Sequence, residues 1–326
     1  MPLLRLISSF LLFTSVFLVG CEPHQNSHDA SISEATLLTM PANMRDLLAR
    51  NTVPIHTTLN TDAVSKIPQD YHFVQDGYFT VAIIAGNSPP ITTLALDNKT
   101  PIGIEVDIAR LIADSLGLKL KLIPTSWEDW PLGIDSGKYD AALINISVSK
   151  ARKARFDFVT YRKDSLGLFV AKDSPIQEIK TAKDVAGQRV IVGAGTNQEK
   201  ILLEWIDENE RLGRAKTTPV YFEDKAMAIL ALEAGRADVY FVPNPSGTWR
   251  MENGANIKRV GYLNGGWPKT ADIAVTLKKG TGLTSAIQSA VDGNIKNGNI
   301  QQALGRWGLA NESLEHSEIN PVGFGE

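Results

Sequence analysis

Apolar residues between positions 101 and 125 follow first the period of a helix and then that of a strand. They recur every three or four residues from Ile104 to Leu116, and Gly117 then offers a helix stop. Leucines alternate with lysines over residues 118–122, which is the period of a strand. The pattern predicts a helix that is followed at once by a strand, as in α/β folds.

The same two periods continue to about residue 307 and predict further elements. Strands are expected over residues 79–84, 139–144, 166–171, 189–192, 238–242 and 273–277. Helices are expected around residues 127–137, 193–205, 227–234, 283–291 and 300–307. The strand at 139–144 is apolar throughout, which is typical of a strand covered on both faces. This alternation predicts an α/β fold with a parallel sheet.

The order of these elements predicts two lobes. Residues 76–171 together with 274–312 form the first lobe, residues 172–273 form the second, and residues 313–326 are a C-terminal tail. Residues 21–75, rich in small polar side chains, are expected to be a tether and lead-in. The chain would cross twice between the lobes and leave a cleft between them. Clefts at domain junctions are where α/β proteins hold small ligands.

The amino terminus has the pattern of an export signal. Arg5 precedes an apolar run over residues 6–19, and the LVGC sequence that ends in Cys21 has the form of a lipoprotein cleavage box. A membrane anchor or a buried helix is the alternative, but the run is shorter than the ~20 residues that span a bilayer. We therefore expect residues 1–20 to be a signal peptide and Cys21, the only cysteine, to receive lipid.

Charge and histidine content exclude several classes of function. The net charge of -3 is spread along the chain without a basic block, so nucleic-acid binding is not expected. All five histidines lie before Phe73 or after Glu315. The two lobes therefore lack a Ser-His or Cys-His catalytic arrangement and a histidine-rich metal site, and no metal or cofactor is expected.

Four short motifs follow one another between residues 103 and 158. They are GIEVD at 103–107, SGKYD at 136–140, ISVSKAR at 146–152 and FDF at 156–158. In this order they resemble the extracellular solute-binding proteins that serve ABC importers of polar amino acids. The likeness extends from about residue 67 to residue 309. The resemblance implies a two-lobe type 2 periplasmic-binding-protein fold, a Venus flytrap with two crossover strands between the lobes.

Arg152 is the first candidate for ligand contact. A planar guanidinium can bind a carboxylate through two parallel hydrogen bonds. The resemblance assigns this role, with the ligand's α-carboxylate, to Arg152, and gives Asn145 and Ser147 supporting polar contacts. The alternative is that Arg152 belongs to a solvated basic turn together with its neighbouring lysines and arginine.

The loop GAGTN over residues 193–197 is the second candidate. Between a strand and a helix, free backbone N–H groups and the helix dipole favour an anionic group. The loop is similar to the segment with which the family clamps the same carboxylate, chiefly through Thr196 and Asn197. It is not a dinucleotide fingerprint, because Gln198 stands where the third glycine should be. Thr196 and Glu199 also fit a capping box, which is a structural use of both.

Trp127 and Asn244 complete the candidate site. Trp127 matches positions where the family packs side chains against the ligand by stacking or cation–π contact, but it also fits a buried core. Pro243 stands where family members that bind α-amino acids place an aspartate for the ammonium group. Proline has no side-chain acceptor, so Asn244 is a candidate substitute. A modified amino acid or another small carboxylate stays open as the ligand.

These features predict a binding protein rather than an enzyme. We expect a monomer, tethered by lipid in the bacterial cell envelope, that captures an amino acid or related small carboxylate for an ABC transporter permease. One alternative is a lyase on the same scaffold, similar to cyclohexadienyl dehydratase, with Glu199 or Glu223 as the acid. The other is a sensor module that signals to a membrane partner without transport.

Overall fold

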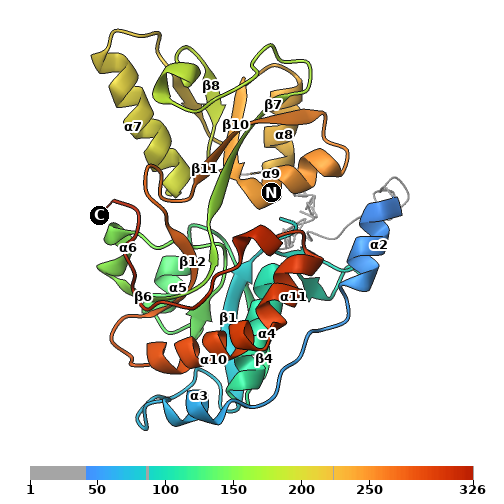
Figure 1. Ribbon diagram of the computed structural model, residues 1–326, viewed down its shortest axis with the longest axis vertical. Helices are drawn as coiled ribbons and strands as arrows, with labels where there is room; N and C mark the ends of the chain where they lie inside the picture. Colours follow the sequence, from blue (N-terminus) through green and yellow to red (C-terminus); the bar gives the residue numbers. More distant parts are fainter. Residues whose placement is uncertain (1–41, 86–87, 223, 326) are drawn as a thin grey trace, which may run out of the picture.

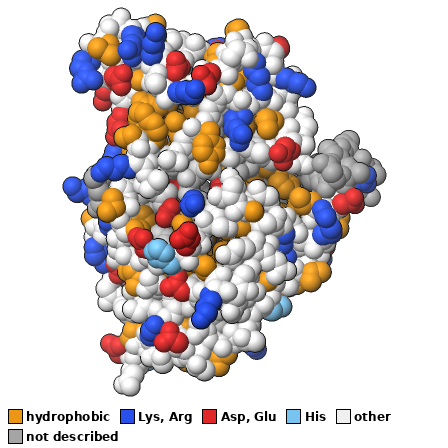
Figure 2. Space-filling view, viewed as in Figure 1, with side chains coloured by type: hydrophobic (Ala, Val, Ile, Leu, Met, Phe, Trp, Pro, Cys, Tyr) orange, Lys and Arg blue, Asp and Glu red, His pale blue; other side chains and the backbone are white. Residues whose placement is uncertain are grey.

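The computed structural model describes residues 42–85, 88–222 and 224–325. The predicted signal peptide and Cys21 lie outside these residues. The described chain forms two lobes stacked along the long axis of the molecule, as predicted (Figure 1). Figure 2 shows Lys and Arg side chains interspersed with Asp and Glu on both lobes. None of the helices in the described ranges combines the length and hydropathy that a membrane span requires.

The first lobe is built on a five-stranded sheet in the order β4–β1–β5–β12–β6. Its strands are β1 (Tyr78–Ile84), β4 (Lys119–Thr125), β5 (Ala141–Ala142), β6 (Phe156–Lys163) and β12 (Asp272–Lys278). Strands β1, β4 and β5 are parallel, whereas β12 is antiparallel to β5 and β6. The prediction of a parallel sheet is therefore wrong for β12, because this strand returns from the second lobe and enters from the opposite end.

Helices at both ends of the chain cover this sheet. They are α3 (Thr61–Ser65), α4 (Ile104–Ser115), α10 (Thr284–Lys296) and α11 (Asn299–Arg306), with α2 (Ala42–Arg50) at the edge and a short hairpin of β2 (Thr93–Leu94) and β3 (Pro101–Ile102). Gly103 precedes α4 with φ of 139°, and a Cβ there would lie 2.3 Å from the carbonyl oxygen of Ile91. Asp107 of α4 accepts hydrogen bonds from Arg306 and, at 2.8 Å, from Trp307 Nε1. The C-terminal helices are thus fixed to the first lobe, as predicted.

The second lobe has its own five-stranded sheet in the order β11–β7–β10–β8–β9. Its elements are β7 (Ser165–Ala171), η1 (Ala182–Val185), β8 (Arg189–Ile191), α7 (Asn197–Arg211), β9 (Thr218–Val220), α8 (Lys225–Glu233), β10 (Val239–Pro243), α9 (Asn244–Glu252) and β11 (Ile257–Asn264). Trp205 of α7 is buried and stacks on Phe241 of β10, with 6.1 Å between ring centroids. This contact packs α7 against the sheet.

The chain crosses between the lobes at Asp164 and again over residues 265–271. The two crossings are hydrogen-bonded, because Gly265 N donates to Asp164 O at 3.1 Å and Asp164 N donates to Ala271 O at 3.3 Å. The sequence analysis placed residues 166–171 in the first lobe, but β7 pairs with β10 and β11 of the second. That boundary is wrong because a single residue separates β6 from β7, and the apolar pattern runs through it.

The predicted tether is partly built into the first lobe. Leu48, Ile55 and Ala63 are buried in its core. Asn60 caps α3 and donates from Nδ2 to Ser289 O of α10 at 3.0 Å. From α2 onward the segment therefore packs as part of the lobe, since its apolar residues cover surface that α10 and α11 leave open.

The predicted C-terminal tail reaches the level where the two lobes meet (Figure 1). Ile319 pairs with Val159 of β6. Phe324 N then donates to Val148 O, and Lys150 N donates to Phe324 O, each at 3.0 Å. The Phe324 side chain is only 5% exposed and packs with the core of the second lobe. The tail is thus a third link between the lobes.

Candidate functional site

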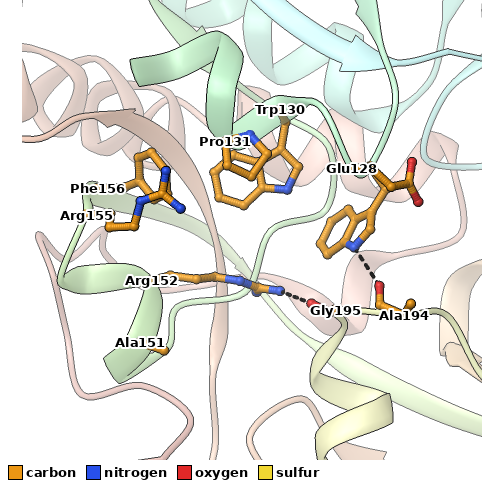
Figure 3. Close-up of a pocket in the computed structure, with 10 residues that line it drawn as sticks. Glu128, Trp130, Pro131, Ala151, Arg152, Arg155, Phe156, Ala194 and Gly195 are labelled. Atoms are coloured by element: carbon orange, nitrogen blue, oxygen red, sulfur yellow. Dashed lines mark hydrogen bonds between the residues drawn. The ribbon is translucent and has the colours of Figure 1, made fainter. Parts of the chain in front are cut away.

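A pocket of about 420 Å³ lies where the lobes meet (Figure 3). The first lobe contributes Trp127 and Arg152, and the second contributes Ala194 and Gly195 from the loop before α7. Trp127 precedes the short helix α5 (Trp130–Asp135). The structure therefore brings together two of the predicted ligand contacts and the loop that was predicted to close over them.

Arg152 contacts both lobes. It lies on α6 (Lys150–Lys153), which begins where Ser149 Oγ accepts a hydrogen bond from Arg152 N at 3.3 Å. The guanidinium donates from Nη1 to Ser147 O at 2.8 Å and to Ser147 Oγ at 3.2 Å. From Nη2 it donates to Gly195 O of the second lobe at 3.1 Å. Arg152 is therefore a partly buried interlobe residue, and the predicted solvated turn is not its environment.

Trp127 also contacts both lobes. The Arg152 guanidinium lies 5.3 Å from the Trp127 ring centroid, a cation–π distance. Trp127 Nε1 donates to Ala194 O of the second lobe at 3.1 Å. Its neighbour Trp130 is the buried core tryptophan instead.

The loop before α7 is held mainly by its own hydrogen bonds. Thr196 Oγ1 accepts from Glu199 N at 3.1 Å and donates to Gly193 O at 2.7 Å, while Glu199 Oε2 accepts from Gly195 N at 2.7 Å. Thr196 and Glu199 are thus capping residues, the structural use that the sequence left open. In this conformation the loop presents carbonyl oxygens, not N–H groups, to Arg152 and Trp127.

Asn197, the first residue of α7, lies against the crossings. Its Nδ2 donates to Asp164 Oδ2 at 3.1 Å and to Gly265 O. One side chain therefore ties the second lobe's helix to both connecting segments.

Asn145 lies beside a buried charge network under the site. Its backbone has φ of 63°, in the left-handed region that asparagine tolerates better than most residues. Its Oδ1 accepts from Arg162 Nη2. Arg162 is fully buried and also binds Glu105 at 3.4 Å and Glu312 of η2 (Ala310–Glu312) at 2.6 Å. Asn145 is thus used by the protein itself in this conformation.

Asn244 lies apart from the other predicted contacts. It begins α9, and its Oδ1 accepts from Arg259 Nη1 at 2.9 Å and from Thr248 Oγ1 at 3.3 Å. No hydrogen bond that the structure records among the described residues joins it to Arg152 or Trp127. Its role as a substitute for the missing aspartate stays a prediction.

Asp164 is the site residue that sequence reasoning missed. Burial raises the pKa of its carboxyl to about 7, although Arg162 and Arg152 act in the opposite direction. Burial likewise lowers the pKa of Arg152 to about 10, and the Asp164 charge partly offsets this. A signal was present, because Lys163 and Asp164 interrupt the apolar run from Phe156 to Ala171. Over the described ranges, no group of three or more Asp, Glu, His or Cys residues is arranged to hold a metal ion.

Two solved structures share this fold. One is AbpA of Streptococcus pneumoniae, an amino acid ABC transporter substrate-binding protein bound to L-arginine, with a TM-score of 0.62, 22% identity and coverage of 73% of this chain and 97% of that chain. The other is the ancestral amino acid-binding protein AncCDT-1, a precursor of cyclohexadienyl dehydratase, with a TM-score of 0.60, 22% identity and coverage of 71% and 95%. At these identities the likeness concerns the fold alone.

Sequence comparison reaches further. The L-cystine-binding protein TcyJ of Escherichia coli is 28% identical over 226 residues, which are 69% of this chain and 80% of that protein. The family model of the bacterial extracellular solute-binding proteins, family 3, matches residues 80–310. This match spans both lobes, both crossings and the pocket between them. The chain therefore belongs to the bacterial extracellular solute-binding proteins, family 3.

Proposed function

We propose that this protein captures an amino acid between its lobes and delivers it to an ABC importer. The observation that carries the proposal is the position of Arg152, whose guanidinium is held by Ser147 of one lobe and reaches Gly195 of the other. Guanidinium groups bind carboxylates strongly and with defined geometry. A ligand carboxylate that replaces the Gly195 carbonyl at Nη2 would exchange a neutral acceptor for a charged one.

Capture would follow from closure of the lobes. With the lobes apart, Arg152 and Trp127 face solvent from the first lobe, and the ligand docks on that side. Rotation about the crossings at Asp164 and residues 265–271 then brings the loop before α7 over the ligand. A ligand that contacts both lobes binds the closed state better and shifts the population toward it.

The ligand class follows from the pocket's chemistry and from the relatives. Arg152 selects a carboxylate, and Trp127 favours a planar or cationic group beside it. L-Cystine and L-arginine, the ligands named for TcyJ and AbpA, are the first compounds to test. A carboxylate without an ordinary α-ammonium remains the competing class, because Pro243 offers no acceptor.

A thermal-shift screen tests the binding proposal. The mature protein is screened against the amino acids, L-cystine and matched carboxylates that lack the amine. A ligand that binds only the folded state raises the melting temperature in proportion to ln(1 + [L]/Kd). A concentration-dependent rise with an amino acid supports the proposal, and no rise with any compound at millimolar concentration rejects it.

The envelope tether is a separate part of the proposal. A lipid on Cys21 would hold the protein, as a monomer, beside the permease, while the mature lobes remain free to bind ligand. Cys21→Ala should move the protein from the membrane fraction to the soluble fraction and remove the mass of the lipid. Unchanged fractionation and mass would reject the tether without affecting the binding proposal.

A lyase is the second candidate, favoured by the likeness to AncCDT-1 and by a buried carboxyl at the cleft with a pKa of about 7. General acids work best when their pKa lies near the operating pH. We nevertheless expect the ligand to be returned intact. Incubation with prephenate or arogenate should give no conversion above that in buffer by mass spectrometry, and catalytic conversion would favour the lyase.

A further inference from the structure

Asp164 is a buried carboxylate with an unused oxygen. The residue is 6% exposed and lies between the two crossings. Its Oδ2 accepts from Asn197 Nδ2 at 3.1 Å, but Oδ1 accepts no hydrogen bond from any residue that the structure describes. Buried polar atoms normally have partners, because an unmet oxygen loses its hydration without replacement. The open oxygen therefore marks a place where a donor would be stabilised.

The neighbouring charges do not supply this donor. Arg162 of β6 attracts the Asp164 carboxylate, but its guanidinium is already bonded to Asn145, Glu105 and Glu312. Glu312 of η2 repels the carboxylate, and Asn197 of α7 meets only Oδ2. The remaining charge is Arg152 of α6, which is the proposed carboxylate site itself.

We propose that Asp164 binds the α-ammonium of the same amino acid whose carboxylate Arg152 holds. This inference rests on the proposed function and extends it to the second charge of the ligand. An α-amino acid carries its two charges on adjacent groups, so it needs a cation and an anion of the protein close together. Asp164 is the one carboxylate, among the described residues, recorded as acting on the Arg152 charge. An ammonium donates three hydrogen bonds, and one of them would satisfy Oδ1.

The position also explains how binding and closure would be coupled. Asp164 belongs to the first crossing, contacts the second through Gly265, and receives a hydrogen bond from the first residue of α7. An ammonium at Oδ1 would therefore join the ligand to the segment about which the lobes rotate. A ligand that lacks the amine would still reach Arg152 but would leave this oxygen unmet.

The test compares an amino acid with its 2-hydroxy acid. The probe is the tightest binder among the amino acids and L-cystine, with the 2-hydroxy acid that has the same side chain. Affinities are measured by calorimetry for wild type, Asp164→Asn and Asp272→Asn. Asparagine has the shape of the protonated aspartate and keeps an acceptor for Asn197. Asp272 is the matched control, because burial raises its pKa to about 6 at the second crossing, where its charged neighbours are Glu318 and Lys163.

Wild type should prefer the amino acid by about thirtyfold or more, the range for one member of a buried charge pair. Asp164→Asn should reduce this preference to about threefold or less while the 2-hydroxy acid binds as before, and Asp272→Asn should keep the preference. A second measurement needs no variant: lowering the pH from 7.5 to 5.5 protonates Asp164 and should weaken amino acid binding more than 2-hydroxy acid binding.

Two results would overturn the role of Asp164. One is an unchanged preference in Asp164→Asn, and the other is an equal loss for both probes, which indicates a structural role. Wild type that binds no amino acid at all would instead reject the proposed function. The two failures are therefore distinct.

Discussion

Arg152 Nη2 lies 3.1 Å from the backbone oxygen of Gly195, and the two residues belong to different lobes. A single side chain on a four-residue helix therefore spans the junction, supported from below by Ser147. Because the acceptor on the second lobe is a carbonyl, the interaction does not depend on the side chain of the loop residue. Closure can thus be tested on the arginine alone.

We predict that Arg152→Ala weakens ligand binding by about thirtyfold to a few thousandfold. Truncating one member of a buried charge pair costs about 2–5 kcal/mol, and roughly 1.4 kcal/mol is tenfold in affinity. Arg152→Lys should recover only part of the loss, because an ammonium lacks the guanidinium fork. Calorimetry with a confirmed ligand measures this. Binding of Arg152→Ala within about threefold of wild type would reject the carboxylate contact.

We predict that Arg162→Met lowers the free energy of unfolding by about 3–5 kcal/mol, because it leaves Glu105 and Glu312 buried without their cation. Arg155→Met is the matched control, since Arg155 pairs with Asp135 on the surface with a side chain that is 58% exposed. Surface pairs contribute about 1 kcal/mol or less. Urea unfolding of both variants measures the difference. Equal effects would mean that the buried network adds nothing beyond a surface pair.

Stability of the ligand-free protein should depend on pH through Asp164. Its pKa is about 7 in the folded state and 3.8 for an unperturbed carboxyl. Between these values the folded state holds a proton that the unfolded state has lost, so stability falls as pH rises from about 4 to about 7. Asp164→Asn removes this loss and should be more stable than wild type at pH 7.5, by a few kcal/mol at most.

Urea unfolding at pH 5 and pH 7.5 checks this prediction. Asp272 has a raised pKa in both proteins, so only the difference between wild type and Asp164→Asn is informative. Parallel pH profiles for the two proteins would show that Asp164 titrates as an ordinary carboxyl.

We predict that Phe324→Ala opens the ligand-free protein as well as destabilising it. Phe324 is fixed to Val148 and Lys150 of the first lobe by its backbone and to the second lobe's core by its ring. Its loss should cost about 3 kcal/mol, the low end for a buried phenylalanine, because the chain end can relax. Small-angle X-ray scattering should show a larger radius of gyration. Val322→Ala, at a side chain that is 68% exposed, should change neither property.

The amino-acid sequence alone determined the two-lobe α/β fold and the position of Arg152. Helix and strand periods are local properties, so α4, β4, α10 and α11 could be read from spacing, and the motifs at 103–107 and 146–152 lie within single local segments. The capping pattern of Thr196 and Glu199 is also local, and the structure contains it.

Tertiary structure decided which strands share a sheet and which side chains meet at the cleft. The pattern could not show that β7 belongs to the second lobe, because a pairing partner such as β10 lies about 70 residues away in sequence. Asp164 is ordinary in sequence and becomes a buried carboxylate only because two crossings and the start of α7 converge on it. Burial and charge coupling depend on neighbours that are distant in the chain, and folding is what makes them neighbours.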